Sequence, residues 1–379
     1  MKVIFIYQVN EYSVGLAGVF NKMLGQLEAI SALGIQTYAI YMSKSDQIFS
    51  KFELGQLKPL EIKSNIPKLE QFKLFWKNAA SIVLANRFDC VYARYDFMFN
   101  TPDLVSFFTE IKEVDCKKVV EFPTFPYEKE LINNSTDEIE QDCKNRLALD
   151  GKIDFTYSTS HSPVLPNTKN YFFTNKLNTE VFAQAAKNIS PLIVNNTIKI
   201  ITVANNCHWH GFDRIIEGLA NYYASEQVIT VEYQLVGEGP ELNNLAKMVS
   251  DKKLDKYVKF HGFKSGDELT QLFSGASIAI ASLGLHRIDL FNSSVLKVRL
   301  YLANGLPLVY CCQDDDLLSF QYKYRVEENN APLDINGLVN FVCELDKNKL
   351  IRNEIRQFAE RNLSWHKFAK DLVQDLLNK

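Results

Sequence analysis

The chain has 379 residues, which is too long for one domain of typical size and predicts two. Hydrophobic residues make up 46% of it and charged residues 23%, which suits a globular protein with a substantial core. The formal net charge is -3, and no segment carries the dense basic run that nucleic-acid binding needs. A nucleic-acid partner is therefore disfavoured.

The sequence shows little sign of a segment that would direct the protein to a membrane or to secretion. The first apolar run, V-I-F-I-Y, is too short for the core of a secretion signal, and no stretch approaches the apolar length of a membrane span. The seven cysteines are scattered and form no C-x-x-C pair, so they predict neither a zinc site nor a disulfide framework. We expect a cytoplasmic protein, with peripheral contact at the inner face of the membrane left open.

The first half of the chain alternates short apolar runs with longer helical patterns, which is typical of a parallel α/β sheet. The predicted strands are residues 2–9, 35–41, 90–93, 118–121 and 153–156. Helices are predicted at about 19–33, closed by Gly34, and at about 68–85. The asparagine-rich segment 167–196 breaks this rhythm and is interpreted as the end of the first domain and the connection to a second.

A second α/β series begins at about residue 198. Its predicted strands are residues 199–203, 230–236, 258–260, 277–281 and 307–310, and its predicted helices are residues 212–223, 267–273 and 294–303, followed by helices to the C-terminus. Sheets of this kind bind ligands at the carboxyl ends of their strands. Two doubly wound domains facing across a cleft, with a site for a phosphorylated ligand, are therefore expected.

Two segments of the first half carry candidate site residues. The loop V-G-L-A-G after the first strand contains Gly15 and Gly18, which let backbone amides approach an anion, although a tight turn explains them equally well. The segment E-F-P-T-F-P-Y-E-K-E starts with Glu121 at the end of a strand, where a carboxylate can bind acceptor hydroxyls or act as a base. The alternative is a surface loop with solvated acids.

The first candidate segment of the second half is C-H-W-H-G-F-D-R, which lies between a strand and a helix. His208, His210 and Arg214 are the side chains there that can hold a diphosphate. A metal site would need further ligands, which the neighbouring sequence does not supply. The alternative is a capped helix with an aromatic plug.

The second candidate segment is S-L-G-L-H-R, followed by S-S-V-L-K-V-R. His286 and Arg287 are predicted in the loop above the sheet, and Ser293 or Ser294 is predicted to cap the next helix. Lys297 then lies in the first turn, where a cation is unfavourable to the helix dipole unless a bound phosphate offsets the cost. The alternative is a lysine that reaches solvent.

Several segments together resemble glycosyltransferase family four, a family of GT-B fold. The resemblance is carried by L-V-G-E-G-P-E-L-N-N-L, V-K-F-H-G-F, L-F-S-G-A-S-I-A-I-A-S-L and L-K-V-R-L-Y-L-A-N-G-L-P-L-V, and is strongest from residue 198 to 309. The segments W-H-G-F-D-R and E-F-P-T-F-P-Y-E-K-E resemble a subset linked to bacterial surface polysaccharide synthesis, such as capsule and lipopolysaccharide.

The resemblance implies a retaining hexosyltransferase with a nucleotide-diphosphate sugar donor, most often UDP-linked, and a glycan or lipid-linked acceptor. It implies no cofactor and no obligatory metal. The implied domains are 1–175, joined by the last helix at 364–379, and 176–363. The implied donor site adds Gly237, Glu238 and Gly239. Arg287 and Lys297 would stabilise the leaving diphosphate, while the acceptor would be met by Glu121, Arg94, Tyr127 and Glu128.

The chain departs from the family at several positions. Leu300 and Asn292 stand where many members carry a pair of glutamates, the second of which holds the nucleotide ribose, and Leu cannot accept those hydrogen bonds. Asn205 and His210 stand where many members have Arg and Lys on the diphosphate. A non-catalytic subunit that supports a partner enzyme therefore stays open as an alternative, as does a sugar-nucleotide 2-epimerase of the same fold.

One segment bears on membranes. The stretch K-L-E-Q-F-K-L-F-W-K, residues 68–77, mixes lysines with large apolar residues. It predicts either a helix on an anionic membrane surface, where lipid-linked acceptors reside, or an ordinary domain helix with lysines that reach solvent.

Overall fold

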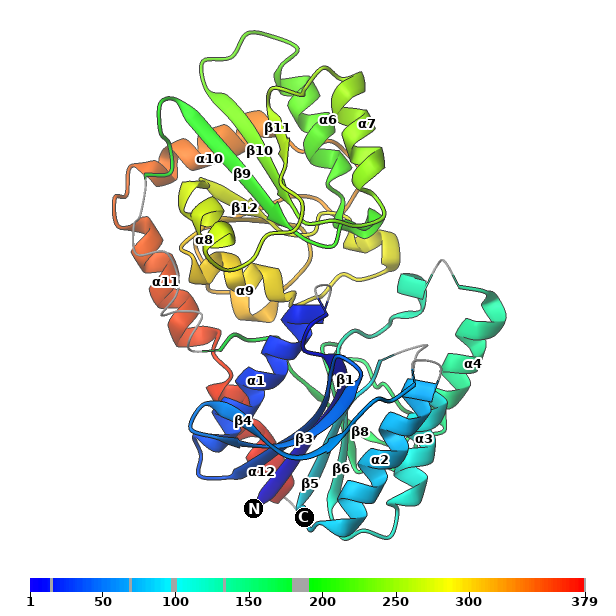
Figure 1. Cartoon of the computed structure of the whole chain (residues 1–379). Helices are drawn as coiled ribbons and strands as arrows, with labels where there is room; N and C mark the ends of the chain where they lie inside the picture. The colour runs from blue at the N-terminus through cyan, green and yellow to red at the C-terminus, as the bar shows by residue number, and fades with distance from the viewer. Residues whose placement is uncertain (14–15, 68–69, 97–100, 132–133, 179–190, 378–379) are drawn as a thin grey trace. The chain divides into compact units, whose positions relative to one another are not determined.

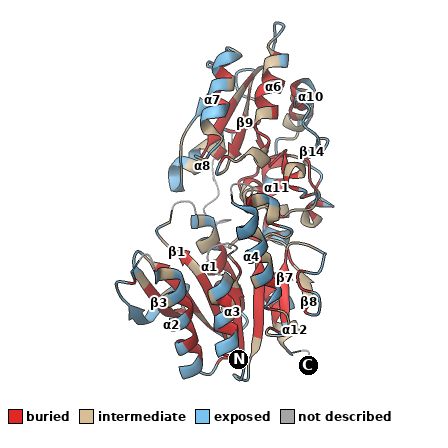
Figure 2. Cartoon of the chain, turned by 90° about the vertical axis from the view of Figure 1, so that its right-hand side faces the viewer, coloured by how far each residue is buried: buried red, intermediate tan, exposed pale blue. Residues whose placement is uncertain are grey.

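A computed structural model of the chain describes residues 1–13, 16–67, 70–96, 101–131, 134–178 and 191–377 (Figure 1). The chain divides into two compact units. The first comprises Met1–Thr174 with Trp365–Lys379, and the second comprises Asn175–Ser364. In both units the central strands are buried and the helices expose one face (Figure 2), as expected for a layered α/β protein.

The strands of the first unit are β1 (Lys2–Asn10), β2 (Gln36–Ser43), β3 (Asp46–Glu53), β4 (Gln56–Lys63), β5 (Cys90–Arg94), β6 (Lys117–Phe122), β7 (Phe155–Ser158) and β8 (Lys169–Phe172). Within the described ranges they form one eight-stranded sheet in the order β4-β3-β2-β1-β5-β6-β7-β8. The pairs are parallel except β2 with β3 and β3 with β4.

The helices of this unit are α1 (Ala17–Ser31), α2 (Gln71–Ala85), α3 (Thr101–Glu110), the short η3 (Glu128–Leu131), α4 (Thr136–Leu147) and α12 (His366–Leu377). Alternate residues of β1 serve opposite faces of the sheet. Ile4 and Ile6 share a core with residues of α2 and α3, while Val3 and Phe5 share one with residues of α1 and α12. The prediction that the last helix returns to the first domain is thereby confirmed.

The hairpin β3–β4 and strand β8 were not predicted. Strand β4 lies at the sheet edge and is exposed almost throughout, so its sequence Q-L-K-P-L-E-I-K lacks the apolar run of a buried strand. Strand β8 falls at the start of the segment 167–196, which was interpreted as the end of the first domain and the connection to the second; its residues are only partly buried. The strand was missed, because an edge strand needs few apolar side chains.

The strands of the second unit are β9 (Thr197–Val203), β10 (Thr230–Val236), β11 (Val258–Phe260), β12 (Ile278–Ile280), β13 (Leu308–Tyr310) and β14 (Lys323–Arg325). In the described residues they form a parallel six-stranded sheet in the order β11-β10-β9-β12-β13-β14. The predicted strands of this half are confirmed, and β14 is added at the edge.

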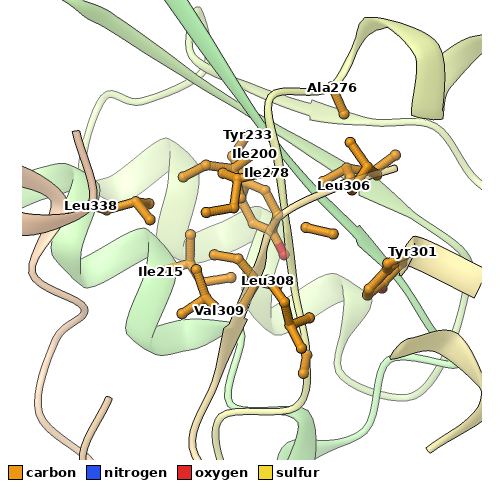
Figure 3. Packing of buried hydrophobic residues seen from close by; sticks show 14 of the residues in the cluster. Ile200, Ile215, Tyr233, Ala276, Ile278, Tyr301, Leu306, Leu308, Val309 and Leu338 are labelled. Carbon is orange, nitrogen blue, oxygen red and sulfur yellow. The ribbon is translucent and has the colours of Figure 1, made fainter. Parts of the chain in front are cut away.

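The helices of this unit are η4 (His208–His210), α6 (Asp213–Tyr222), α7 (Leu242–Asp251), α8 (Gly266–Gly275), η5 (Leu285–Ile288), α9 (Leu296–Ala303), η6 (Asp315–Leu317), α10 (Ile335–Asp346) and α11 (Ile351–Asn362). The core joins side chains of the sheet, such as Ile200 and Ile278, with Ile215 of α6, Tyr301 of α9 and Leu338 of α10 (Figure 3). This core fixes α9 against the sheet.

Candidate functional site

The candidate site lies at the carboxyl ends of three neighbouring parallel strands in the second unit. Strand β9 is the first of this sheet in the chain, and its neighbours are β10 on one side and β12 on the other. The strand order therefore reverses at β9, and doubly wound sheets bind ligands at such a point. The loops after β9, β10 and β12 contain the predicted segments around His210, Gly237 and Arg287.

Two glycines let the loop after β10 lie directly against the loop after β9. Gly237 and Gly239 have φ values of +114° and +138°, and a side chain at either position would collide with the backbone of Ala204 or Asn206. The backbone N–H of Asn206 donates to the Glu238 carbonyl at 2.5 Å, and the Asn206 side-chain amide donates to the same oxygen at 3.1 Å. The predicted glycine turn is thus a tightly fitted pair of loops.

The loops after β9 and β12 also meet at glycines. A Cβ atom on Gly211 would lie 2.7 Å from the backbone nitrogen of Gly284. The Leu283 N–H donates to the His210 carbonyl at 2.8 Å. These contacts place His210 and the segment 283–288 side by side.

Arg287 connects the same two loops through its guanidinium. The group donates to both carboxylate oxygens of Asp213, at 3.0 and 2.8 Å, and to the His208 carbonyl at 2.6 Å. The neighbouring His286 ring lies 3.1 Å from the side-chain oxygen of Asn330 through its Nε2. Sequence reasoning did not identify Asp213 as the partner of Arg287.

Arg214 has a structural position instead of the diphosphate-binding position that was predicted for it. The residue is buried, and its guanidinium donates to the carbonyls of Ala331 at 2.7 Å, Leu283 at 2.6 Å and Glu327 at 3.1 Å. The Arg214 guanidinium therefore joins α6 to two loops, the one after β12 and the one between β14 and α10.

The predicted serine cap of α9 is also corrected. The helix begins at Leu296 after the N-cap residue Val295, which makes no side-chain cap hydrogen bond. The Ser294 hydroxyl instead accepts from the Asn175 N–H at 2.9 Å, while the Ser293 N–H donates to the Gln313 carbonyl. The first amides of α9 are thus left without a side-chain cap.

Lys297 lies in the first turn of α9, as predicted, but it does not reach solvent. Its ammonium nitrogen is inaccessible to water and has no hydrogen-bond partner among the described residues. It lies 5.4 Å from the ring centroid of Phe212. Burial lowers the pKa of Lys297 to about 7, against opposing effects of Cys312 and Cys207.

His210 shares the aromatic surface of Phe212. The two rings are stacked, with centroids 5.4 Å apart and planes 18° apart. The His210 Nδ1 accepts from the Cys207 N–H at 3.0 Å, which fixes the ring. Burial, and then the charge of Lys297, hold the pKa of His210 well below its usual range. Sequence reasoning interpreted Phe212 only as the start of a helix.

In the first unit, Glu121 is fully buried in a network of polar side chains. The carboxylate lies 2.8 Å from the Lys22 ammonium, and accepts from the hydroxyls of Tyr7 and Tyr92 and from the Gln26 amide at 2.8 to 3.0 Å. Burial alone would raise the pKa of Glu121, but Lys22 and then Arg94 lower it to about 2. A permanently ionised, enclosed carboxylate is unsuited to the predicted roles of base or acceptor ligand.

The other predicted residues of this unit have mixed positions. Arg94 is partly accessible and pairs with Asp96 at 2.9 Å. Tyr127 is buried, and its hydroxyl donates to Asp142 at 2.6 Å, so it belongs to the core and its predicted contact with an acceptor is corrected. Glu128 pairs with Arg146 at 3.3 Å.

Two further predictions concern the glycines of the first loop and the helix at 68–85. Gly18 lies in the first turn of α1, while Gly15 is outside the described residues.

Helix α2 buries Phe75 and Trp76 and exposes Phe72, and residues 68–69 are outside the description. No helix in the described ranges combines the length and apolar character needed to cross a membrane.

Candidate metal ligands were sought in the same part of the chain. The described residues contain no group of three or more His, Cys, Asp or Glu side chains that could hold a metal ion.

The architecture of the two units is that of GT-B glycosyltransferases. Solved structures similar to this one include sucrose-phosphate synthase from Thermosynechococcus elongatus, with a TM-score of 0.69 at 13% identity, covering 99% of this chain and 98% of that one. The Anabaena protein HepE in complex with UDP-glucose is similar with a TM-score of 0.61 at 15% identity, with 99% of each chain covered. TarM has a TM-score of 0.58 at 10% identity, covering 100% and 99%. No protein-family description and no curated protein matches the sequence.

Proposed function

We propose that this protein is a glycosyltransferase whose donor, a nucleotide-diphosphate sugar, binds in the second unit. The observation that carries the proposal is the ammonium of Lys297, inaccessible to water and without a hydrogen-bond partner in the described residues, in the first turn of α9. A cation in this position is disfavoured by the helix dipole and by the free-energy cost of burial. A bound anion would offset both costs, which supports an anion-binding role for Lys297. The uncapped amides of α9 supply further donors for the same anion.

The neighbouring loops suit a diphosphate and its nucleoside. Gly237 and Gly239 fit closely against the loop after β9, so this part of the site presents backbone groups and not side chains. In the proposed reaction, Lys297 and the α9 amides stabilise the charge that builds on the leaving diphosphate. Arg287, already paired with Asp213, acts by holding the loops after β9 and β12 in register.

The finer parts of the proposal rest on the resemblance and on the names of similar structures. HepE has been solved with UDP and with UDP-glucose, which supports a UDP-linked donor. The proposed reaction transfers a hexose with retention to a glycan or lipid-linked acceptor in bacterial surface polysaccharide assembly, at the cytoplasmic side of the membrane. The proposal requires no metal. Arg94, which is 12% exposed beside Glu121, is the proposed acceptor-side residue.

One observation favours a second candidate function, a non-catalytic subunit of a glycosyltransferase complex. Leu300 packs against the core of the second unit, at the position where the family resemblance implies a ribose-binding carboxylate. Asn292 likewise replaces the first glutamate of that pair. A subunit of this kind would keep the fold and lose donor turnover.

A panel of sugar nucleotides separates the two functions. Because a ligand that binds only the native state raises the melting temperature, UDP- and GDP-sugars are screened for thermal stabilisation, and each stabilising one is then assayed for hydrolysis and transfer. The enzyme proposal expects stabilisation by a UDP-sugar and release of UDP. No stabilisation and no release with any donor, together with co-purification of a second glycosyltransferase-like chain, would contradict it and favour the subunit.

A further inference from the structure

Among the described residues, the groups near Lys297 that favour its charged form have a smaller effect on its pKa than burial has. The titratable groups that face it are Cys207 and His210 from the loop after β9 and Cys312 from the segment after β13. Among the described residues no carboxylate forms an ion pair or a hydrogen bond with its ammonium. The ring of Phe212 also lies close to the ammonium.

Three physical effects therefore act on this amine in the same direction. Burial removes the water that would solvate an ammonium ion. The amides of the first turn of α9 place partial positive charge beside it. His210 adds a second group that would repel it if both were protonated. The quadrupole of the Phe212 ring, a weak attraction, and the nearby thiols of Cys312 and Cys207 act in the opposite direction and favour the charged form.

A bound diphosphate reverses this balance. It places negative charge at the helix N-terminus, within reach of the amine, and an opposite charge at close range favours the protonated form. The proton comes from solvent. The Cys312 thiol keeps its own proton, because its hydrogen bond with Cys311 and its burial hold its pKa well above the usual range. The His210 ring accepts a backbone hydrogen bond at Nδ1, and burial holds its pKa well below the usual range. The ion pair that results is also the one that would stabilise the leaving group.

We propose that Lys297 takes up a proton when a diphosphate binds at the N-terminus of α9, so that donor binding consumes one proton and weakens as the pH rises above neutrality. This inference rests on the proposed function, because it needs a diphosphate ligand at this helix. The direction of the pKa of Lys297, lowered by burial to about 7, agrees with it.

Proton uptake is measured by titrating the whole protein with UDP at pH 8 in buffers of different ionisation enthalpy. At this pH the terminal phosphate of UDP is already ionised, since its pKa is about 6. The slope of binding enthalpy against buffer enthalpy gives the number of protons taken up. The wild type is expected to take up about 0.9 proton, because an amine of pKa near 7 is mostly neutral at pH 8.

Two variants locate the proton. Lys297→Arg keeps a permanent positive charge, so its slope is expected to be near zero while UDP still binds. His210→Gln removes the other titratable base, and its slope is expected to equal that of the wild type. The pH dependence of the wild type alone gives a further check, with Kd rising by about tenfold from pH 8 to pH 9.

The outcomes separate the inference from the proposed function. Binding of UDP by the wild type without proton uptake, and with constant Kd from pH 8 to pH 9, would overturn the inference alone. Proton uptake that persists in Lys297→Arg or disappears in His210→Gln would place the proton elsewhere and overturn it as well. Absence of any UDP binding by the wild type would overturn the proposed function and the inference with it.

Discussion

The ammonium of Lys297 lies over the ring of Phe212, 5.4 Å from its centroid, and His210 stacks on the same ring. The lysine comes from the first turn of α9 and the aromatic residue from the start of α6, more than 80 residues earlier in the chain. This pairing joins the loops of β9 and β12 at the point where the strand order reverses. It is the local arrangement on which the proposed donor site rests.

Replacing Lys297 with Met is expected to stabilise the protein at neutral pH. The pKa of Lys297 is lowered from 10.5 to about 7 on folding, so the unfolded chain binds the proton more firmly. The loss of folding stability caused by burying this lysine is therefore complete below pH 7, and it disappears as the pH rises towards 10.5. Urea unfolding should show the variant more stable by more than about 1 kcal/mol at pH 7, with the gap closing by pH 10. A variant less stable than the wild type at pH 7 would contradict this prediction.

The buried pair of Lys22 and Glu121 predicts acid sensitivity of the first unit. Glu121→Gln should destabilise the protein by about 3 to 5 kcal/mol at pH 7, because it leaves Lys22 without a charged partner. The pKa of Glu121 falls from 4.5 to about 2 on folding, so its contribution is present above pH 4.5 and lost as the pH falls towards 2. Unfolding measured at pH 7, 4 and 3 should show the wild type and the variant converging. If the difference in unfolding free energy between the wild type and the variant stays constant over this pH range, the destabilisation by Glu121→Gln comes from packing and not from the charge of Glu121.

Gly211 and Gly262 form a matched pair for testing the loop contact. Both have left-handed backbones, with φ of +66° and +63°, but a Cβ at Gly211 would meet Gly284 while one at Gly262 would meet nothing within 4 Å. Gly262→Ala should cost about 1 kcal/mol from the backbone alone. Gly211→Ala should cost clearly more in the same unfolding assay, and should also weaken UDP binding by separating the loops after β9 and β12. Equal costs would show that the loops can move apart freely.

Arg299 is expected to be the most sensitive arginine of the second unit. It is fully buried, donates to Asp314 and Asp316, and holds the Asn175 carbonyl at 2.7 Å. Arg299→Met should destabilise the protein by about 3 to 5 kcal/mol, because the buried carboxylate of Asp314 loses its guanidinium partner, while Asp316 keeps its pair with Lys176. The control is Arg325→Met, whose exposed pair with Glu328 at 3.9 Å should contribute less than about 1 kcal/mol. Thermal unfolding compares the two variants. Small decreases of similar size in the melting temperatures of both would contradict the expectation that Arg299 is the more sensitive arginine.

The sequence predicted the parts of the fold that depend on local pattern. Strands β9 and β10 are seven-residue segments rich in buried apolar side chains, and they lie within two residues of the predicted bounds. The glycine turn after β10 was visible because only glycine fits a φ of +114° against a neighbouring backbone. The edge strands β4 and β8 were not visible, because they bury little and carry no apolar run.

The candidate site was predictable only in outline. Arg214 and Lys297 are both cations near a helix start, yet loop carbonyls surround the first and an aromatic ring faces the second. Ser294 has the residue type of a helix cap, but Asn175, distant in sequence, occupies its hydroxyl. Glu121 was placed correctly at a strand end, but its burial depends on Lys22 and two tyrosines from other elements. Such partners follow from tertiary packing and leave no local signal.

Calorimetric titration of UDP into the wild type, Lys297→Ala and Lys347→Ala tests the central claim most directly. Lys347, at the end of α10, is an exposed lysine paired with Glu344 and serves as the matched control. If Lys297 holds the donor diphosphate, its replacement should weaken UDP binding by at least about tenfold, which corresponds to about 1.4 kcal/mol, while the control binds like the wild type. Equal affinity of Lys297→Ala and the wild type for UDP would remove this lysine from the site and contradict the account.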